Sequence, residues 1–105
     1  MHVISRKPFR DAAKLYPNSR IAIDDCYRAL KKGTFETPDE LRQVFQSLDN
    51  FKYRDRWWVI DISGNKLRLL AFIDFKLNRI YVRHIINHVG HERLTNEYRK
   101  ERKKK

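Results

Sequence analysis

Two arginines, Arg68 and Arg83, lie in consecutive segments whose side chains alternate as they do in β-strands. A guanidinium group is planar and always charged, and its N–H donors match the oxygens of a phosphate. Side chains two residues apart share one face of a strand, so Arg68 shares a face with Leu70 and Phe72. In the second segment we expect every other side chain to point inward, namely Ile80, Val82, His84 and Ile86. Both arginines would then lie on one concave face.

Basic and aromatic residues lie near these arginines in the sequence (Lys52, Tyr53, Trp57, Lys66 and Tyr81). Aromatic rings offer stacking surfaces for unpaired bases, and cations neutralise phosphates. A single arginine on a strand is most simply a solvated charge. Two on adjacent strands with these neighbours favour an anion-binding face suited to RNA.

Histidine is the usual acid or base near neutral pH. His88 lies where the last predicted strand ends, and it is the candidate for proton transfer, although an ordinary surface role is the alternative. His84 is expected to be a hydrogen-bonded core residue. His88 and His91 are three residues apart, but no cysteine or carboxylate follows at a matching spacing, so we expect no metal.

Other catalytic classes lack their motifs. The three glycines are scattered, so no phosphate-binding loop is expected, and no cofactor is implied. Cys26 falls on the apolar side of a predicted helix and is expected to be a small buried hydrophobe. The aspartates are dispersed and form no convincing pair for a metal-dependent nuclease (Asp49, Asp55, Asp61 and Asp74).

Length and charge bound the possibilities. A chain of 105 residues suits one domain, and a net charge of +11 indicates a polyanionic partner, either nucleic acid or a membrane surface. The single cysteine agrees with a reducing compartment. We find no signal peptide at the N-terminus and no run long enough to span a membrane, so the expected location is the cytoplasm.

The first half of the chain predicts helices. Residues 2–5 suggest a short strand, and a helix follows from Pro8 to Pro17. A second helix, capped by Asn18 or Ser19, ends at Gly33 and buries its apolar side (Ile23, Cys26, Tyr27 and Leu30). A third begins at Thr37 as N-cap, with Pro38 first and Glu40 completing a capping box; its apolar face has Leu41, Val44 and Phe45.

The second half changes to a period of two. Segments 52–63, 66–75 and 79–87 are rich in β-branched and aromatic residues and are joined by short turns at 63–65 and 76–78, which predicts a three-stranded antiparallel meander. Residues 89–102 predict a marginal helix that runs into a frayed basic end. The expected fold is α+β, with an N-terminal helical hairpin on one face of an antiparallel sheet. Residues 1–98 would form one domain and residues 99–105 a basic tail.

Three segments, taken in order, carry a resemblance. Leu48-Asp49-Asn50-Phe51-Lys52-Tyr53, then Gly64-Asn65-Lys66-Leu67-Arg68-Leu69, then Tyr81-Val82-Arg83 followed by Asn87-His88 resemble the HigB toxins of bacterial toxin–antitoxin pairs. The similarity extends over nearly the whole chain, including the Met-His-Val-Ile start and the Lys31-Lys32-Gly33 helix end.

This resemblance implies a RelE-like fold and ribosome-dependent, metal-independent cleavage of mRNA. Its partners would be mRNA on the ribosome, ribosomal RNA and a cognate helix-turn-helix antitoxin. By motif, Arg68 and Arg83 correspond to phosphate-contacting arginines, His88 to the acid–base residue, and Lys52 and Lys66 to basic RNA contacts, beside which Tyr53 would offer a stacking surface. A tyrosine often stands three residues after the motif histidine, where this chain has His91 as a possible substitute.

Two rival functions use the same basic sheet face. One is a non-catalytic module that binds RNA or the ribosome, for which alanine at His88 would change little. The other is a structural protein that docks an acidic protein partner and has no affinity for RNA.

Overall fold

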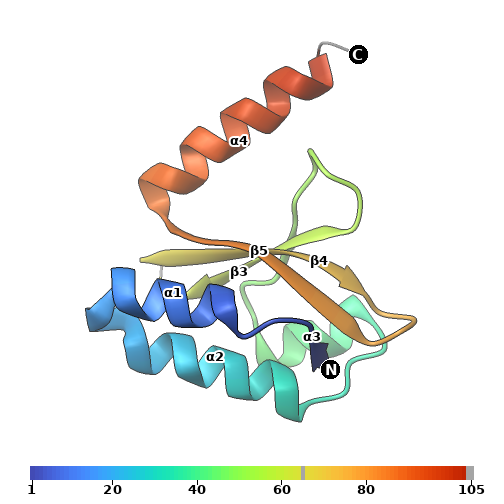
Figure 1. Ribbon diagram of the computed structural model, residues 1–105. Helices are drawn as coiled ribbons and strands as arrows, with labels where there is room; N and C mark the ends of the chain where they lie inside the picture. The colour runs from blue at the N-terminus through green and yellow to red at the C-terminus, as the bar shows by residue number, and fades with distance from the viewer. Residues whose placement is uncertain (65, 104–105) are drawn as a thin grey trace.

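A five-stranded mixed sheet in the order β1-β5-β4-β3-β2 forms the centre of the protein (Figure 1). The computed structural model describes residues 1–64 and 66–103. The strands are β1 (His2–Val3), β2 (Asp49–Asn50), β3 (Trp57–Ile62), β4 (Leu67–Asp74) and β5 (Arg79–Asn87). The helices are α1 (Lys7–Leu15), the short 3-10 helix η1 (Pro17–Ser19), α2 (Arg20–Lys32), α3 (Pro38–Val44) and α4 (His88–Lys103).

Helices α1 and α2 form a hairpin that covers one face of the sheet, whereas α4 rises from the opposite face (Figure 1). The core lies between the hairpin and the sheet. Ile23 and Leu30 of α2 pack there with inward side chains of the strands, such as Ile60, Leu69 and Ile80, and all five residues are fully buried. The predicted α+β class with an N-terminal helical hairpin is confirmed. No helix among the described residues is both long and apolar enough to cross a membrane.

The antiparallel meander of β3, β4 and β5 is confirmed, and the face of β4 predicted to be buried lies in the core, with Leu67, Leu69, Ala71 and Ile73 at most 2% exposed. The strand predicted over residues 52–63 is too long, because β3 begins only at Trp57. Residues 51–56 form a turn-rich loop that closes the β2–β3 connection, with the Phe51 amide donating to the Trp57 carbonyl. Arg56 has a φ of 60°, which a continuous strand does not allow.

A β-bulge in β5 changes the predicted faces. Leu70 pairs with His84 and Ala71 pairs with Val82, so Arg83 has no partner in β4. One extra residue reverses the alternation beyond it. Ile85 consequently lies in the core, and the prediction that His84 is a core histidine is wrong: it lies on the opposite face, with its ring 6.1 Å from that of Trp57.

The caps of α2 and α3 are partly as predicted. Thr37 accepts a hydrogen bond from the Glu40 amide and caps α3, but the Glu40 carboxylate accepts from the Glu36 amide instead of completing the reciprocal pair. Ser19 takes the N-cap position of α2 without making a side-chain cap bond. Leu41 of α3 is buried and Phe45 packs on the core, whereas Val44 is 53% exposed. The predicted apolar face of α3 is therefore too wide.

The C-terminal segment is helical to Lys103, so the predicted boundary between residues 98 and 99 falls inside α4. Lys104 and Lys105 of the predicted tail, and Asn65 of the first predicted turn, lie outside the described residues. The division into a domain and a tail stays a prediction.

Gly33 ends α2 for a different reason from the one predicted. Its φ of −84° and ψ of 160° are extended, so the left-handed conformation of a helix C-terminal glycine is absent. A Cβ at this position would lie 2.3 Å from Cζ of Phe35, whose ring is 5% exposed and belongs to the core. Glycine is needed here for the close approach of that ring.

Replacing Gly33 with alanine should therefore lower the free energy of unfolding by about 1–3 kcal/mol, the usual cost of overpacking a core. Chemical denaturation checks this value. The loss should shrink in a Phe35→Leu background, where the side chain that would clash is shorter. An equal loss in both backgrounds would contradict the explanation.

Candidate functional site

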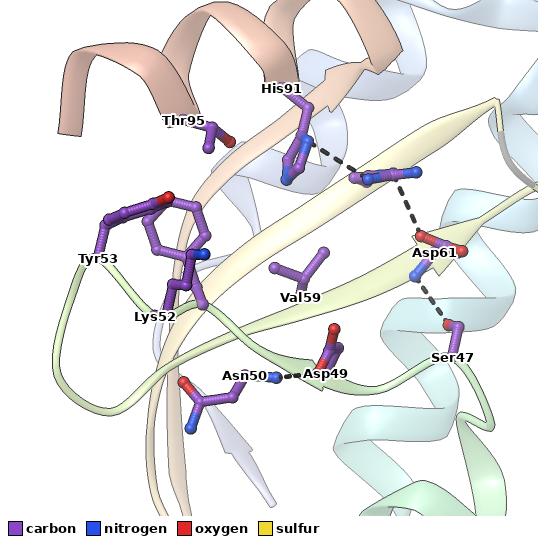
Figure 2. A pocket seen from close by; sticks show the side chains of 11 residues that line it. Ser47, Asp49, Asn50, Lys52, Tyr53, Val59, Asp61, His91 and Thr95 are labelled. Carbon is purple, nitrogen blue, oxygen red and sulfur yellow. Dashed lines mark hydrogen bonds and ion pairs between the residues drawn. The ribbon is translucent and has the colours of Figure 1, made fainter. Parts of the chain in front are cut away.

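A pocket of about 450 Å³ opens on the face of the sheet opposite the helical hairpin (Figure 2). Its walls come from four places: the segment that includes β2, strand β3, strand β4 and helix α4. Its lining residues are Ser47, Asp49, Asn50, Phe51, Lys52, Tyr53, Val59, Asp61, Arg68, His91 and Thr95. The pocket therefore brings residues 47–53, which precede β3, together with helix α4, which lies about 40 residues later in the sequence.

Arg68 lies between an acid and a histidine. Its Nε is 3.5 Å from Oδ1 of Asp61, and its Nη1 is 3.3 Å from Nδ1 of His91. Asp61 faces it because the two residues are direct partners in the β3–β4 register. Arginine can only donate, so Nδ1 of His91 accepts and the proton of the neutral ring is assigned to Nε2.

The surroundings of His91 favour its neutral form. Burial lowers its pKa below the usual 6.5, and the nearby Arg68 and His88 lower it further, against the opposing influence of Asp61 and Glu92. A neutral imidazole beside an arginine can accept a proton while the arginine holds an anion.

Three buried polar atoms of the pocket have no hydrogen-bond partner among the described residues: Nε of Arg68, Nε2 of His91 and Oγ1 of Thr95. Nε of Arg68 is within ion-pair distance of Asp61 but does not meet hydrogen-bond geometry. Unpaired buried donors are costly, and a buried group that lacks a partner requires an explanation. An anion bound in the pocket would offer acceptors to all three.

An aromatic cluster supports α4 over the sheet. The ring of Tyr98 meets those of Phe51 and Trp57 at 5.7 and 5.4 Å, edge to face, and its hydroxyl is 3.4 Å from Nε2 of His84. Arg54 lies 4.3 Å from the centre of the Tyr98 ring and forms an ion pair with Glu101. These contacts connect the 51–56 loop to α4 and thereby hold His91 near Arg68.

Four of the predicted site residues meet in this pocket: Lys52, Tyr53, Arg68 and His91. Lys52 also lies 5.1 Å from the centre of the Tyr53 ring. Sequence reasoning missed Asp61 and Thr95. Asp61 could have been found from the β3–β4 register, and Thr95 from its spacing of four residues after His91, which puts both on one side of a helix.

Arg83 does not join Arg68. It is exposed at the bulge and lines a separate hollow beside α1, with its guanidinium 5.9 Å from the centre of the Tyr81 ring. Arg83 therefore does not share the pocket of Arg68: it has no partner in β4, and the simple alternation that grouped the two arginines is interrupted at the bulge.

His88 and Lys66 also lie outside the lining of the pocket. His88 is the first residue of α4, its side chain is 57% exposed, and its Nε2 is 3.3 Å from Oε1 of Glu92. Lys66 is exposed immediately before β4. Proximity to Arg68 therefore favours His91 over His88 as the proton-accepting group.

The remaining chemistry-bearing groups are placed as follows. Cys26 is buried in the core, and burial raises the pKa of its thiol to about 12, which agrees with the predicted hydrophobic role. Within residues 1–64 and 66–103, no three His, Cys, Asp or Glu side chains are grouped as metal ligands.

Comparison with known proteins relates the chain to one family. Residues 19–94 match the family model of the HigB toxin, described as the RelE-like toxic component of a toxin–antitoxin system. The chain is 48% identical over 99 residues to the mRNA interferase HigB of Escherichia coli O6:H1 strain CFT073, covering 94% of this chain and 96% of that protein. It is 36% identical over 104 residues to the mRNA interferase toxin HigB of Escherichia coli K12, covering 99% and 100%.

Proposed function

Since this chain belongs to the HigB family of RelE-like toxins, we propose that it is an endoribonuclease that cuts mRNA on the ribosome and so blocks translation. The observation that carries the proposal is the position of Arg68 in the pocket, paired with Asp61 and next to a neutral histidine. Two relatives that match it over nearly their whole length are named mRNA interferases.

The proposed reaction uses the RNA itself as the nucleophile and needs no metal. The 2′-hydroxyl attacks the adjacent phosphorus, a 2′-O–P bond forms, and the P–O5′ bond breaks to leave a cyclic phosphate and a 5′-hydroxyl. Arg68 stabilises the charge that develops on the phosphoryl oxygens, which is expected to be the largest contribution. His91 is neutral and accepts the proton of the 2′-hydroxyl at Nδ1, its unprotonated nitrogen, as Nη1 of Arg68 leaves Nδ1 for a phosphoryl oxygen.

Residues around the pocket are proposed to hold the RNA. Lys52 and Tyr53 line the pocket and supply a charge and a stacking surface. Arg83 and Lys66 lie outside it and would contact the phosphate backbone further along the strand. His88 is one turn before His91 on α4 and is the candidate for delivering a proton to the leaving 5′-oxygen.

The ribosome is proposed to provide the geometry that the pocket lacks. The pocket contains one histidine, and His88, the proposed acid, lies outside its lining, so cleavage of free RNA should be slow. A ribosome that holds mRNA in line for attack reduces the entropic part of the barrier. The net charge of +11 favours ribosomal RNA as a docking surface. We further propose a cytoplasmic location and neutralisation by a helix-turn-helix antitoxin.

The test is induced expression of the protein followed by mapping of mRNA 5′ ends, together with incubation of the purified protein with mRNA in the presence and absence of translating ribosomes. We expect growth arrest, new 5′-hydroxyl ends within coding regions, and cleavage that depends on ribosomes. Co-expression of an antitoxin encoded beside it should prevent both effects. Ribosome binding without new ends would favour the non-catalytic alternative and contradict the proposal.

A further inference from the structure

The charge of the pocket differs from the charge of the protein. The chain carries a net +11, but among the lining residues two cations, Lys52 and Arg68, face two carboxylates, Asp49 and Asp61. A carboxylate beside the binding site of a polyanion weakens binding, because like charges repel. Asp61 must therefore serve something other than affinity for RNA.

The position of Asp61 is closely defined by its surroundings. It lies in β3 directly opposite Arg68, and its backbone amide donates a 2.9 Å hydrogen bond to Oγ of Ser47. The Asp61 and Arg68 side chains are 27% and 26% exposed, so the carboxylate meets the guanidinium in a largely enclosed space. An ion pair of this kind is screened less by salt than one on the open surface.

Asp61 and His91 together orient the guanidinium. Asp61 lies 3.5 Å from Nε in an ion-pair contact, and Nδ1 of His91 accepts from Nη1, so two of the three guanidinium nitrogens are contacted. The N–H donors that lack a hydrogen-bond partner, Nε among them, are left for an anion in the pocket. An arginine without such support can adopt many rotamers, and a loosely held group loses much of its effect on a transition state.

We propose that Asp61 is a positioning residue that holds the guanidinium of Arg68 in register with His91 and with the scissile phosphate, at a cost in RNA affinity. This role rests on the proposed ribonuclease function and deepens it. If Asp61 has this role, loss of its charge should strengthen RNA binding and slow RNA cleavage at the same time. A residue that only supports the fold would weaken both.

Asp61 also influences His91 through its charge. Arg68 and His88 lower the pKa of His91, while Asp61 and Glu92 raise it. Removal of the Asp61 charge should therefore lower the pKa of His91 further, an effect that can be measured in the free protein by NMR titration of the ring protons.

The experiment compares Asp61→Asn and Asp61→Glu with the wild type. Binding is measured with an RNA that carries 2′-O-methyl groups and resists cleavage, and cleavage is measured in single turnover on mRNA-loaded ribosomes. Asp61→Asn should bind the RNA about fivefold more tightly and cleave mRNA at least about tenfold more slowly. Asp61→Glu keeps the charge, so it should restore wild-type affinity and recover part of the rate.

Asp25→Asn is the matched control, because it removes the same charge from a side chain on α2 that is 68% exposed and outside the pocket. It should change neither the cleavage rate nor the pKa of His91. If Asp61→Asn does not fold, as judged by thermal unfolding, Asp61→Glu still separates rate from affinity.

Three results would overturn the proposal. Cleavage by Asp61→Asn at the wild-type rate would remove the positioning role and leave the ribonuclease function standing. Weaker RNA binding by Asp61→Asn together with slower cleavage would indicate a structural role alone. Failure of the wild type itself to cleave on ribosomes would overturn the ribonuclease function and this role with it, whereas the NMR titration would still report whether Asp61 acts on His91.

Discussion

Replacement of Arg68 with alanine should abolish mRNA cleavage and growth arrest while the protein stays folded. We expect a loss of at least about 10²-fold in the single-turnover rate, the size of effect found when one donor to a developing oxyanion is removed. The fold should tolerate the change because the Arg68 side chain is 26% exposed and is absent from the hydrophobic core, although Asp61 loses its partner. Mapping of mRNA 5′ ends measures the loss, and circular dichroism checks the fold.

Two further variants sharpen this prediction. Arg68→Lys keeps the charge but loses the planar fork, so it should recover RNA affinity better than rate. Arg83→Ala should lower the rate less than Arg68→Ala, because Arg83 lies in a separate hollow beside α1, and its effect should be largest on binding at low salt. A larger loss for Arg83→Ala than for Arg68→Ala would contradict the assignment of the pocket as the cleavage site.

His91→Asn should reduce cleavage by about 10²-fold, a typical contribution of general base catalysis. Asparagine keeps an acceptor near the position of Nδ1, so Arg68 retains its neighbour, but it cannot take up a proton. The matched variant is His88→Asn, which changes a histidine outside the pocket that pairs with Glu92. It should lower the rate less, and the reverse order would return the acid–base role to His88.

The pH dependence gives an independent check on His91. A general base acts in its unprotonated form, so the rate should be full above its pKa and fall as the pH drops below it. Because burial and the charge of Arg68 lower the pKa of His91 from 6.5, the break in kcat/KM of the wild type should appear below pH 6.5. The fall should be absent in His91→Asn, and a wild-type rate that rises on acidification would contradict the role of a base.

Much of the fold could be predicted because its signals are local. The residues of β4 alternate strictly, so the buried row that includes Leu67 and Leu69 follows from the period of two. Thr37-Pro38 marks the start of α3 because a side-chain cap and a missing amide act within one turn. Composition and charge likewise indicate a polyanion as partner without any knowledge of the structure.

The site could be predicted only in part. Lys52, Tyr53, Arg68 and His91 were named from the sequence and do meet in one pocket. The pairing of Arg68 with Asp61 depends on strand register, and the nearness of His91 depends on how α4 returns over the sheet through Tyr98. Such contacts join residues far apart along the chain, and no local period encodes them.

Arg68 and Arg83 differ in how their surroundings are encoded. Local alternation of side chains is enough to place both on neighbouring strands. The bulge that keeps Arg83 out of the pocket, and the contacts of Asp61 and His91 with Arg68, arise from tertiary packing. The physical reason is that alternation is a property of each strand alone, whereas a bulge, a register and the docking of a helix are settled by the packing of the whole domain.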